Sequence, residues 1–208
     1  VLFKVSNYTF VYDSAYLGVG IAFPNSYTLE GMNFVCVGDE LRKKCKPIRK
    51  NTGAIAGIYN WLASWVRTEV KDNWELAYNK KNRYVKVTLS DEKCGQFDVY
   101  TYHMPCAFTN PDLMLIQASA LLNFITREAE LKPYILAGDF NSKPGGEVYN
   151  MITMAKRPGR DIPSANFYFT PHFYSYHLKS AYKEVNGVEP LFTCSAYSKV
   201  DKTLFRDT

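Results

Sequence analysis

The stretch YILAGDFNSKPGGEVY, residues 134–149, predicts the fold class. Four apolar residues at 134–137 indicate a short buried strand, and Gly138 is expected to end it. The Pro-Gly-Gly run at 144–146 then breaks the chain before a helix predicted to begin at Glu147. A buried strand, a polar loop and a helix in this order are typical of a layered α/β protein.

Two polar side chains follow this strand directly. Asp139 and Asn141 stand two residues apart, and on an extended backbone both side chains would point to one face. A carboxylate and an amide at the carboxyl end of a buried strand are a common basis for a hydrolytic site. Alternatively, the two residues only make turn hydrogen bonds, as Asp and Asn often do. The local pattern leaves both interpretations open.

The segments around this stretch alternate between strand and helix patterns. We predict a hairpin over 82–104, with its turn at 92–95, and a single domain that covers residues 1–208. The class is therefore α/β with mixed strand direction. The remaining predicted strands are two runs within 8–23, one at 33–37, and a final pair at 178–183 and 191–194. The predicted helices cover about 52–70, 110–131 and 147–155, and 156–177 is predicted to be a long ordered loop.

The composition bounds the class of protein. The chain has 208 residues, of which 47% are apolar, so it can bury one sizeable core. No apolar run reaches the length of a membrane span, and we expect a soluble protein that makes no membrane contact. The five cysteines are an odd number and include no Cys-x-x-Cys pair, which favours a reducing, intracellular compartment that the sequence does not specify further.

Positive charge is concentrated in one short run. The net charge is +5, and Lys43, Lys44 and Lys46 belong to a set of six basic residues between positions 42 and 50 that contains no acid. Such a cluster can bind phosphates by releasing counterions, and we expect these three lysines to contact a nucleic-acid substrate. The alternative is a solvated loop without a binding role.

His103 lies at the end of the predicted strand 97–104, where Pro105 stops the ladder. A histidine at this place, one strand away from Asp139, is a candidate phosphate contact. The alternative is a histidine with a purely structural role. If the predicted fold is right, His103 and Asp139 lie at adjacent strand ends.

Several motifs occur together in one order. They are Gly-Val-Gly-Ile-Ala at 18–22, Asn82-Arg83, Tyr102-His103, Gln117-Ala118, Gly-Asp-Phe-Asn-Ser-x-Pro at 138–144, and Leu-Lys-Ser-Ala-Tyr with Glu-Pro-Leu-Phe-Thr within 178–193. In this combination the chain resembles the endonuclease/exonuclease/phosphatase superfamily of metal-dependent phosphodiesterases. It is most similar to the branch of poly(A) deadenylases, nocturnin, the angel proteins and the 2′-phosphodiesterase.

This resemblance implies a fold and a chemistry. The fold would be a four-layered α/β sandwich, with two packed mixed sheets flanked by helices, incomplete at both ends in these 208 residues. The reaction would be attack of water on a phosphodiester of RNA or a related nucleotide, assisted by Mg²⁺. The implied catalytic residues are Asp139, Asn141 and His103, of which Asp139 and Asn141 would also bind the metal. Ser142 and Arg83 would bind substrate.

The chain departs from the family pattern at three places. It contains neither the Gln-Glu pair that supplies a metal-binding Glu nor the Asp-His pair of the family, and Cys194 stands where an Asn is usual. Two interpretations follow. Either the missing ligands lie outside these residues in an active, deadenylase-like enzyme, or the chain is an inactive member that serves as a structural or RNA-binding subunit of a larger ribonucleoprotein.

Overall fold

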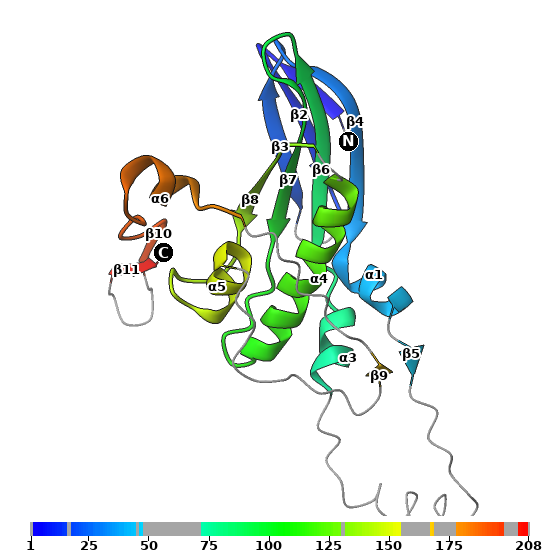
Figure 1. The fold of residues 1–208 in the computed structure, drawn as a ribbon, viewed down its shortest axis with the longest axis vertical. Coiled ribbons are helices and arrows are strands. Elements are labelled where there is room, and N and C mark those ends of the chain that lie inside the picture. Colours follow the sequence, from blue (N-terminus) through cyan, green and yellow to red (C-terminus); the bar gives the residue numbers. More distant parts are fainter. Residues whose placement is uncertain are drawn as a thin grey trace, which may run out of the picture.

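The computed structural model describes residues 2–15, 18–44, 46–47, 72–129, 132–154, 167–168, 178–197 and 204–207 (Figure 1). The predicted helix over 52–70 lies outside these residues. So does the predicted loop over 156–177, apart from the short strand β9 (Phe167–Tyr168), which pairs with β5 (Lys46–Pro47). Within the described part, the chain is a mixed α/β protein, as predicted.

The larger sheet has four strands and contains the predicted hairpin. Its order is β4-β6-β7-β8, and every pair is antiparallel except β7 and β8, which run parallel. Mixed strand direction is thereby confirmed. The strands are β4 (Thr28–Cys36), β6 (Arg83–Asp91), β7 (Gly95–His103) and β8 (Tyr134–Asp139).

A smaller antiparallel sheet packs on one face of the larger one. It consists of β1 (Leu2–Val5), β2 (Tyr8–Asp13) and β3 (Val19–Pro24). Successive strand residues point to opposite faces. Alternate residues of β6 can therefore join a core with β2 and β3, made of Val11, Phe23, Val85, Val87 and Leu89.

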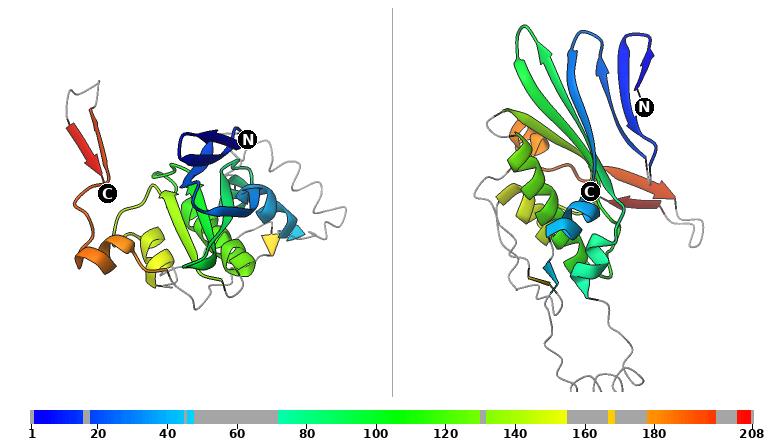
Figure 2. Two further views of the ribbon diagram at one scale, coloured as in Figure 1. Left: turned by 90° about the horizontal axis from the view of Figure 1, so that it is seen from above. Right: turned by 90° about the vertical axis from the view of Figure 1, so that its right-hand side faces the viewer.

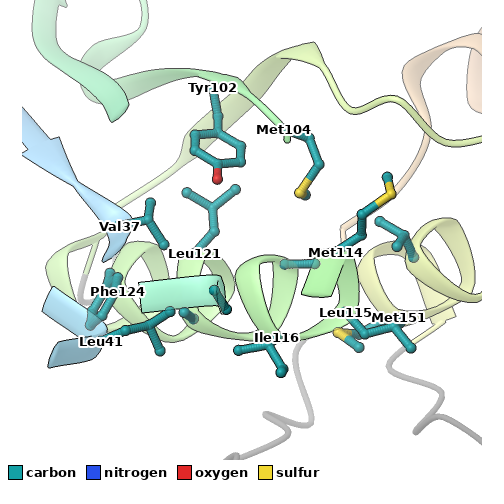
Figure 3. Close-up of a cluster of buried hydrophobic side chains, with 14 of the residues drawn as sticks. Val37, Leu41, Tyr102, Met104, Met114, Leu115, Ile116, Leu121, Phe124 and Met151 are labelled. Carbon is teal, nitrogen blue, oxygen red and sulfur yellow. The ribbon is translucent and has the colours of Figure 1, made fainter. Parts of the chain in front are cut away.

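Helices cover the opposite face of the larger sheet. The main one is α4 (Pro111–Ala129), and the others are α1 (Val37–Lys44), α3 (Asn73–Tyr78) and α5 (Glu147–Met154). Figure 3 shows Tyr102 and Met104, at the end of β7, within this core. Tyr102 donates its hydroxyl hydrogen bond to Gln117 Oε1 at 2.7 Å, and Gln117 Nε2 donates to the carbonyl of Ala77. Gln117 thus joins β7, α4 and α3.

Two predicted elements have a different conformation. The run predicted as a basic loop begins as helix α1, because Val37 and Leu41 stand four residues apart and are both fully buried in the helix core. The strand predicted at 178–183 is replaced by α6 (Ala181–Asn186). The Ser180 side chain accepts a hydrogen bond from the Lys183 N–H at the start of α6, and Gly187 ends it in the left-handed conformation.

Residues 178–189 are joined to α5 by hydrogen bonds. Glu189 accepts hydrogen bonds from the hydroxyls of Tyr149 and Ser180, which connects α5 to the ends of α6. The chain then forms a two-stranded ladder of β10 (Cys194–Tyr197) and β11 (Leu204–Asp207) (Figure 2). The predicted strand at 191–194 therefore begins only at Cys194.

The described residues form three layers, namely the small sheet, the large sheet and the helices. The fourth layer of the implied sandwich is not among them and stays a prediction. On the outer face of the small sheet, Tyr8, Phe10 and Tyr12 are exposed. In the part of the chain that the structure describes, no helix is long and apolar enough to cross a bilayer.

We expect the protein to lose stability at alkaline pH because the large sheet contains buried tyrosines. Burial raises the pKa values of Tyr84, Tyr100 and Tyr102 above the ordinary tyrosine value. A tyrosine whose pKa is higher in the folded protein than in the unfolded chain stabilises the fold at pH values below the unfolded pKa of about 10. This stabilisation is lost as pH rises above the unfolded pKa and through the folded pKa. Urea unfolding midpoints should therefore fall between about pH 8 and about pH 11. Tyr100→Phe should reduce the fall, and an equal fall in this variant would contradict the assignment.

Candidate functional site

The candidate residues meet where β7 and β8 end side by side. His103 and Asp139 are register partners at the carboxyl ends of these parallel strands, as predicted. Both side chains lie on one face of the sheet, with His103 Nε2 3.7 Å from Asp139 Oδ2. The His103 side chain is 34% exposed and that of Asp139 is 64% exposed, so both are accessible to a ligand. We call this end of β6, β7 and β8 the rim.

Gly138 sets how closely β8 approaches β7 at the rim. It has a φ of +143°, and a Cβ atom placed on it would lie 2.0 Å from the carbonyl oxygen of Tyr102. Only glycine combines this backbone conformation with this approach. Gly138 therefore does not end the strand, as the sequence suggested, but allows β8 to continue to Asp139.

Asn141 reaches the rim by a turn and not by strand alternation. The strand ends at Asp139, and Asn141 has a left-handed φ of +45°, a conformation that Asn tolerates better than most residues. Its backbone N–H donates to Asp139 Oδ1 at 2.9 Å, which is the turn predicted as the alternative. Its Nδ2 donates to the carbonyl of Met104 at 2.8 Å. The two side chains are thus close together, but for a different reason from the one predicted.

Arg83 begins β6 and continues the row formed by His103 and Asp139. Its Nε donates to Asp13 Oδ2 at the end of β2, and its Nη2 lies 3.4 Å from the carbonyl oxygen of Phe34. The ion pair joins the two sheets at the rim and is largely shielded from solvent. Asp13 was not predicted from the sequence, because no local pattern relates residues that are 70 positions apart.

The remaining predicted substrate contacts, Ser142 and the lysines, lie on different parts of the fold. Ser142 follows Asn141 and is half-buried at the rim. Lys43 lies on α1, is mostly exposed, and its Nζ is 2.5 Å from Glu40 Oε1. The hydrogen bond to Glu40 raises the pKa of Lys43. Glu40 lies one turn before Lys43 and outside the basic run, so the prediction made from that run did not include it. The side chains of Lys44 and Lys46 lie outside the described residues.

A cavity of about 630 Å³ lies between β4, α1 and the end of α4. Of the predicted site residues, Arg83 and Lys43 line it, whereas Asp139 and Asn141 do not. The acid and the amide therefore lie outside this cavity. Asp139 instead faces solvent at the rim.

The rim supplies few of the ligands that a magnesium ion requires. Mg²⁺ takes six oxygen ligands in octahedral geometry, commonly one or two carboxylates together with substrate oxygens and water. Asp139 is exposed and suitable, but Asp13 is paired with Arg83, and one Asn141 amide hydrogen is used by Met104. Among the described residues, no group of three or more His, Cys, Asp or Glu side chains is placed to hold a metal ion. The described rim therefore does not form a magnesium site by itself.

No protein-family model matches the sequence, and no curated protein matches it. Solved structures do match it in part. A crystal structure of ANGEL2, described as a 2′,3′-cyclic phosphatase in complex with adenosine-2′,3′-vanadate, has a TM-score of 0.48 and 19% identity, over 72% of this chain and 37% of that chain. The catalytic domain of human nocturnin with bound sulfate has a TM-score of 0.45 and 15% identity, over 70% of this chain and 47% of that chain.

A protein of unknown function from Enterococcus faecalis V583 has a TM-score of 0.46 and 10% identity, over 78% of this chain and 64% of that chain. The chain spans between about a third and two thirds of the length of these structures. ANGEL2 and nocturnin carry two of the names given for the branch in the sequence resemblance above.

Proposed function

We propose that the rim binds a phosphodiester of RNA or a related nucleotide and that the protein hydrolyses it, in the manner of a deadenylase-like phosphodiesterase. One observation carries the proposal, namely the pairing of His103 with Asp139 at adjacent strand ends on one accessible face. Their separation of 3.7 Å exceeds a hydrogen bond, so both groups keep capacity for a ligand.

Each rim residue has a distinct part in this proposal. His103 donates an imidazole N–H to a non-bridging phosphate oxygen, which stabilises the charge that develops there. Asp139 orients a water molecule and accepts its proton as the water oxygen attacks phosphorus. The bond to the leaving oxygen breaks, and that oxygen takes a proton from solvent. Ser142 and Asn141 border the phosphate position, and Arg83, paired with Asp13, lies at the start of the next strand.

Magnesium enters the proposal only as an ion whose other ligands lie outside the described residues. Of the described residues, Asp139 would contact it, with the Asn141 side-chain oxygen as a second donor. When bound, such an ion would neutralise charge on the phosphate oxygens. None of the steps assigned to His103 and Asp139 depends on it.

His103→Gln tests the proposal. Glutamine keeps an N–H donor but holds it on a longer, more flexible side chain, so we expect kcat for a short 5′-labelled polyadenylate to fall by about 10²-fold. The assay uses the full-length protein, with and without added MgCl₂, and resolves the products by length. Turnover in His103→Gln equal to that of the wild type would overturn the proposal.

The same assay distinguishes the hydrolytic function from the alternative, in which the protein binds RNA but is inactive. It predicts that the wild type retains RNA on a filter without shortening it, with or without added Mg²⁺. The pairing of Lys43 with Glu40 does not favour this alternative, because it leaves less unpaired positive charge on α1. We therefore place the hydrolytic function first.

A further inference from the structure

We propose that Asn82 is a positioning residue for His103, holding the end of β7 in the place where its imidazole faces Asp139. Asn82 directly precedes β6 and is only 3% exposed, so its side chain offers almost no surface to a substrate. Its Nδ2 donates to the carbonyl oxygen of His103 at 2.8 Å. The inference rests on the proposed function.

The carbonyl of His103 needs this partner because the ladder between β6 and β7 has ended. The last register pair at this end is Tyr84 with Tyr102. Beyond it, the backbone turns toward α1, where the carbonyl of Asn82 accepts the N–H of Val37 at 3.2 Å. The Asn82 side chain therefore replaces a missing strand contact, and a shielded carbonyl without a donor would be unfavourable.

The next residue is held from the other side. The Met104 N–H donates to the carbonyl of Asp139 at 2.7 Å, and the Met104 carbonyl accepts from Asn141 Nδ2. Two asparagine side chains thus hold consecutive carbonyls, Asn82 from the β6 side and Asn141 from the β8 side. The assignment of each Nδ2 follows from the acceptor that it faces, since a carbonyl oxygen can only accept.

The consequence is geometric precision at the rim. With the backbone fixed on both sides, the Cα atom of His103 has a defined position relative to Asp139, and only the side-chain torsions remain free. A displacement of about 1 Å at a reacting group costs about 10²-fold in rate. A residue that fixes the backbone of His103 therefore acts on kcat and not on substrate affinity.

Three variants of the full-length protein test the inference. Asn82→Ala removes the donor, and Asn82→Asp replaces it with a carboxylate of the same shape. Asn25→Asp is the matched control, because Asn25 Nδ2 also donates to a backbone carbonyl, that of Ser6 at 3.1 Å, at the opposite end of β2 from the rim. We expect kcat for labelled polyadenylate to fall by about 10-fold or more in both Asn82 variants, with KM changed less than about twofold, and to stay unchanged in Asn25→Asp.

The pH profile separates positioning from a general loss of structure. A protonated carboxyl group has an O–H donor, so Asn82→Asp should recover toward the wild-type kcat as pH falls. The kcat of Asn82→Ala divided by the kcat of the wild type should stay constant over the same pH range, because alanine has no donor at any pH. If the kcat of Asn82→Asp relative to the wild type decreased as pH is lowered, this result would count against the inference.

Amide hydrogen exchange gives a readout that needs no turnover. In Asn82→Ala, we expect the Met104 amide to exchange at least about tenfold faster, while the Val99 amide in the middle of β7 is unchanged. An active wild type with unchanged kcat in the Asn82 variants overturns the inference and leaves the proposed function intact. An inactive wild type overturns the proposed function, and Met104 exchange then decides whether Asn82 holds the strand end.

Discussion

Replacing Asp139 by Asn is expected to lower kcat/KM for an RNA oligonucleotide by about 10³-fold, the largest effect on activity that we predict. Asparagine has nearly the same shape, and its side-chain oxygen still accepts the hydrogen bond that Asn141 N–H gives to Asp139 Oδ1. The turn at the rim is therefore retained. What is lost is the negative charge and the ability to accept a proton from water.

The melting temperature should change little in this variant, because Asp139 is largely exposed and, among the described residues, its one ionisable neighbour is His103 at 3.7 Å. Asp91→Asn is the matched control. Asp91 Oδ1 accepts hydrogen bonds from the N–H groups of Lys93 and Cys94 in the turn between β6 and β7, at the other end of the sheet. The same chemical change there should leave kcat/KM unaltered.

A wild-type rate in Asp139→Asn would remove the acid from the mechanism and with it the proposed hydrolysis. A matching loss in Asp91→Asn would show instead that the change acts through the stability of the sheet. Steady-state kinetics on both proteins, together with thermal unfolding, distinguish these results.

Replacing Gly138 by Ala should have the largest effect on stability, a loss of about 4 kcal/mol or more in the free energy of unfolding. The added Cβ would meet backbone atoms of the neighbouring strand, 2.0 Å from the Tyr102 carbonyl oxygen and 2.9 Å from its nitrogen. A flexible side chain could move aside, but these atoms belong to the ladder. The φ of +143° adds strain that an L-residue does not accommodate.

Gly145→Ala separates the steric clash from the backbone strain. Gly145 also has a positive φ, of +82°, but a Cβ placed on it has no neighbour within 4 Å. We expect this variant to lose only about 1–2 kcal/mol. Urea unfolding of both variants measures the difference, and similar losses would mean that the close approach of β8 to Tyr102 contributes little.

The large hairpin and the main helix were predictable from the sequence because each is determined by local pattern. Strand alternation with a turn at 92–95 predicted β6 and β7, and Pro111 with a helical apolar stripe predicted α4. The predictions for the segments that form α1 and α6 were wrong, because short segments have only a weak periodic pattern. α1 depends on the burial of two residues by other helices, and α6 depends on caps at Ser180 and Gly187.

The candidate site shows the same division. The acid, the amide and the histidine were identified from residue type and position, and strand order then predicted that His103 and Asp139 would be neighbours. The partners of these groups were not predictable. Asp13 meets Arg83, and Asn82 meets His103, only after the strands have paired. Lys43 had a nearby acid whose relevance appeared only once α1 was a helix.

The sequence by itself determined which chemical groups this protein can offer and the order of its main strands and helices, because propensity and hydrophobic period act over a few neighbouring residues. Only the tertiary structure decided which groups are free to act. The register of β7 against β8 placed His103 opposite Asp139, and Gly138 permitted their approach. Hydrogen bonds between distant segments then held Arg83 on Asp13 and the end of β7 on Asn82, since such contacts form only when the chain brings remote residues together.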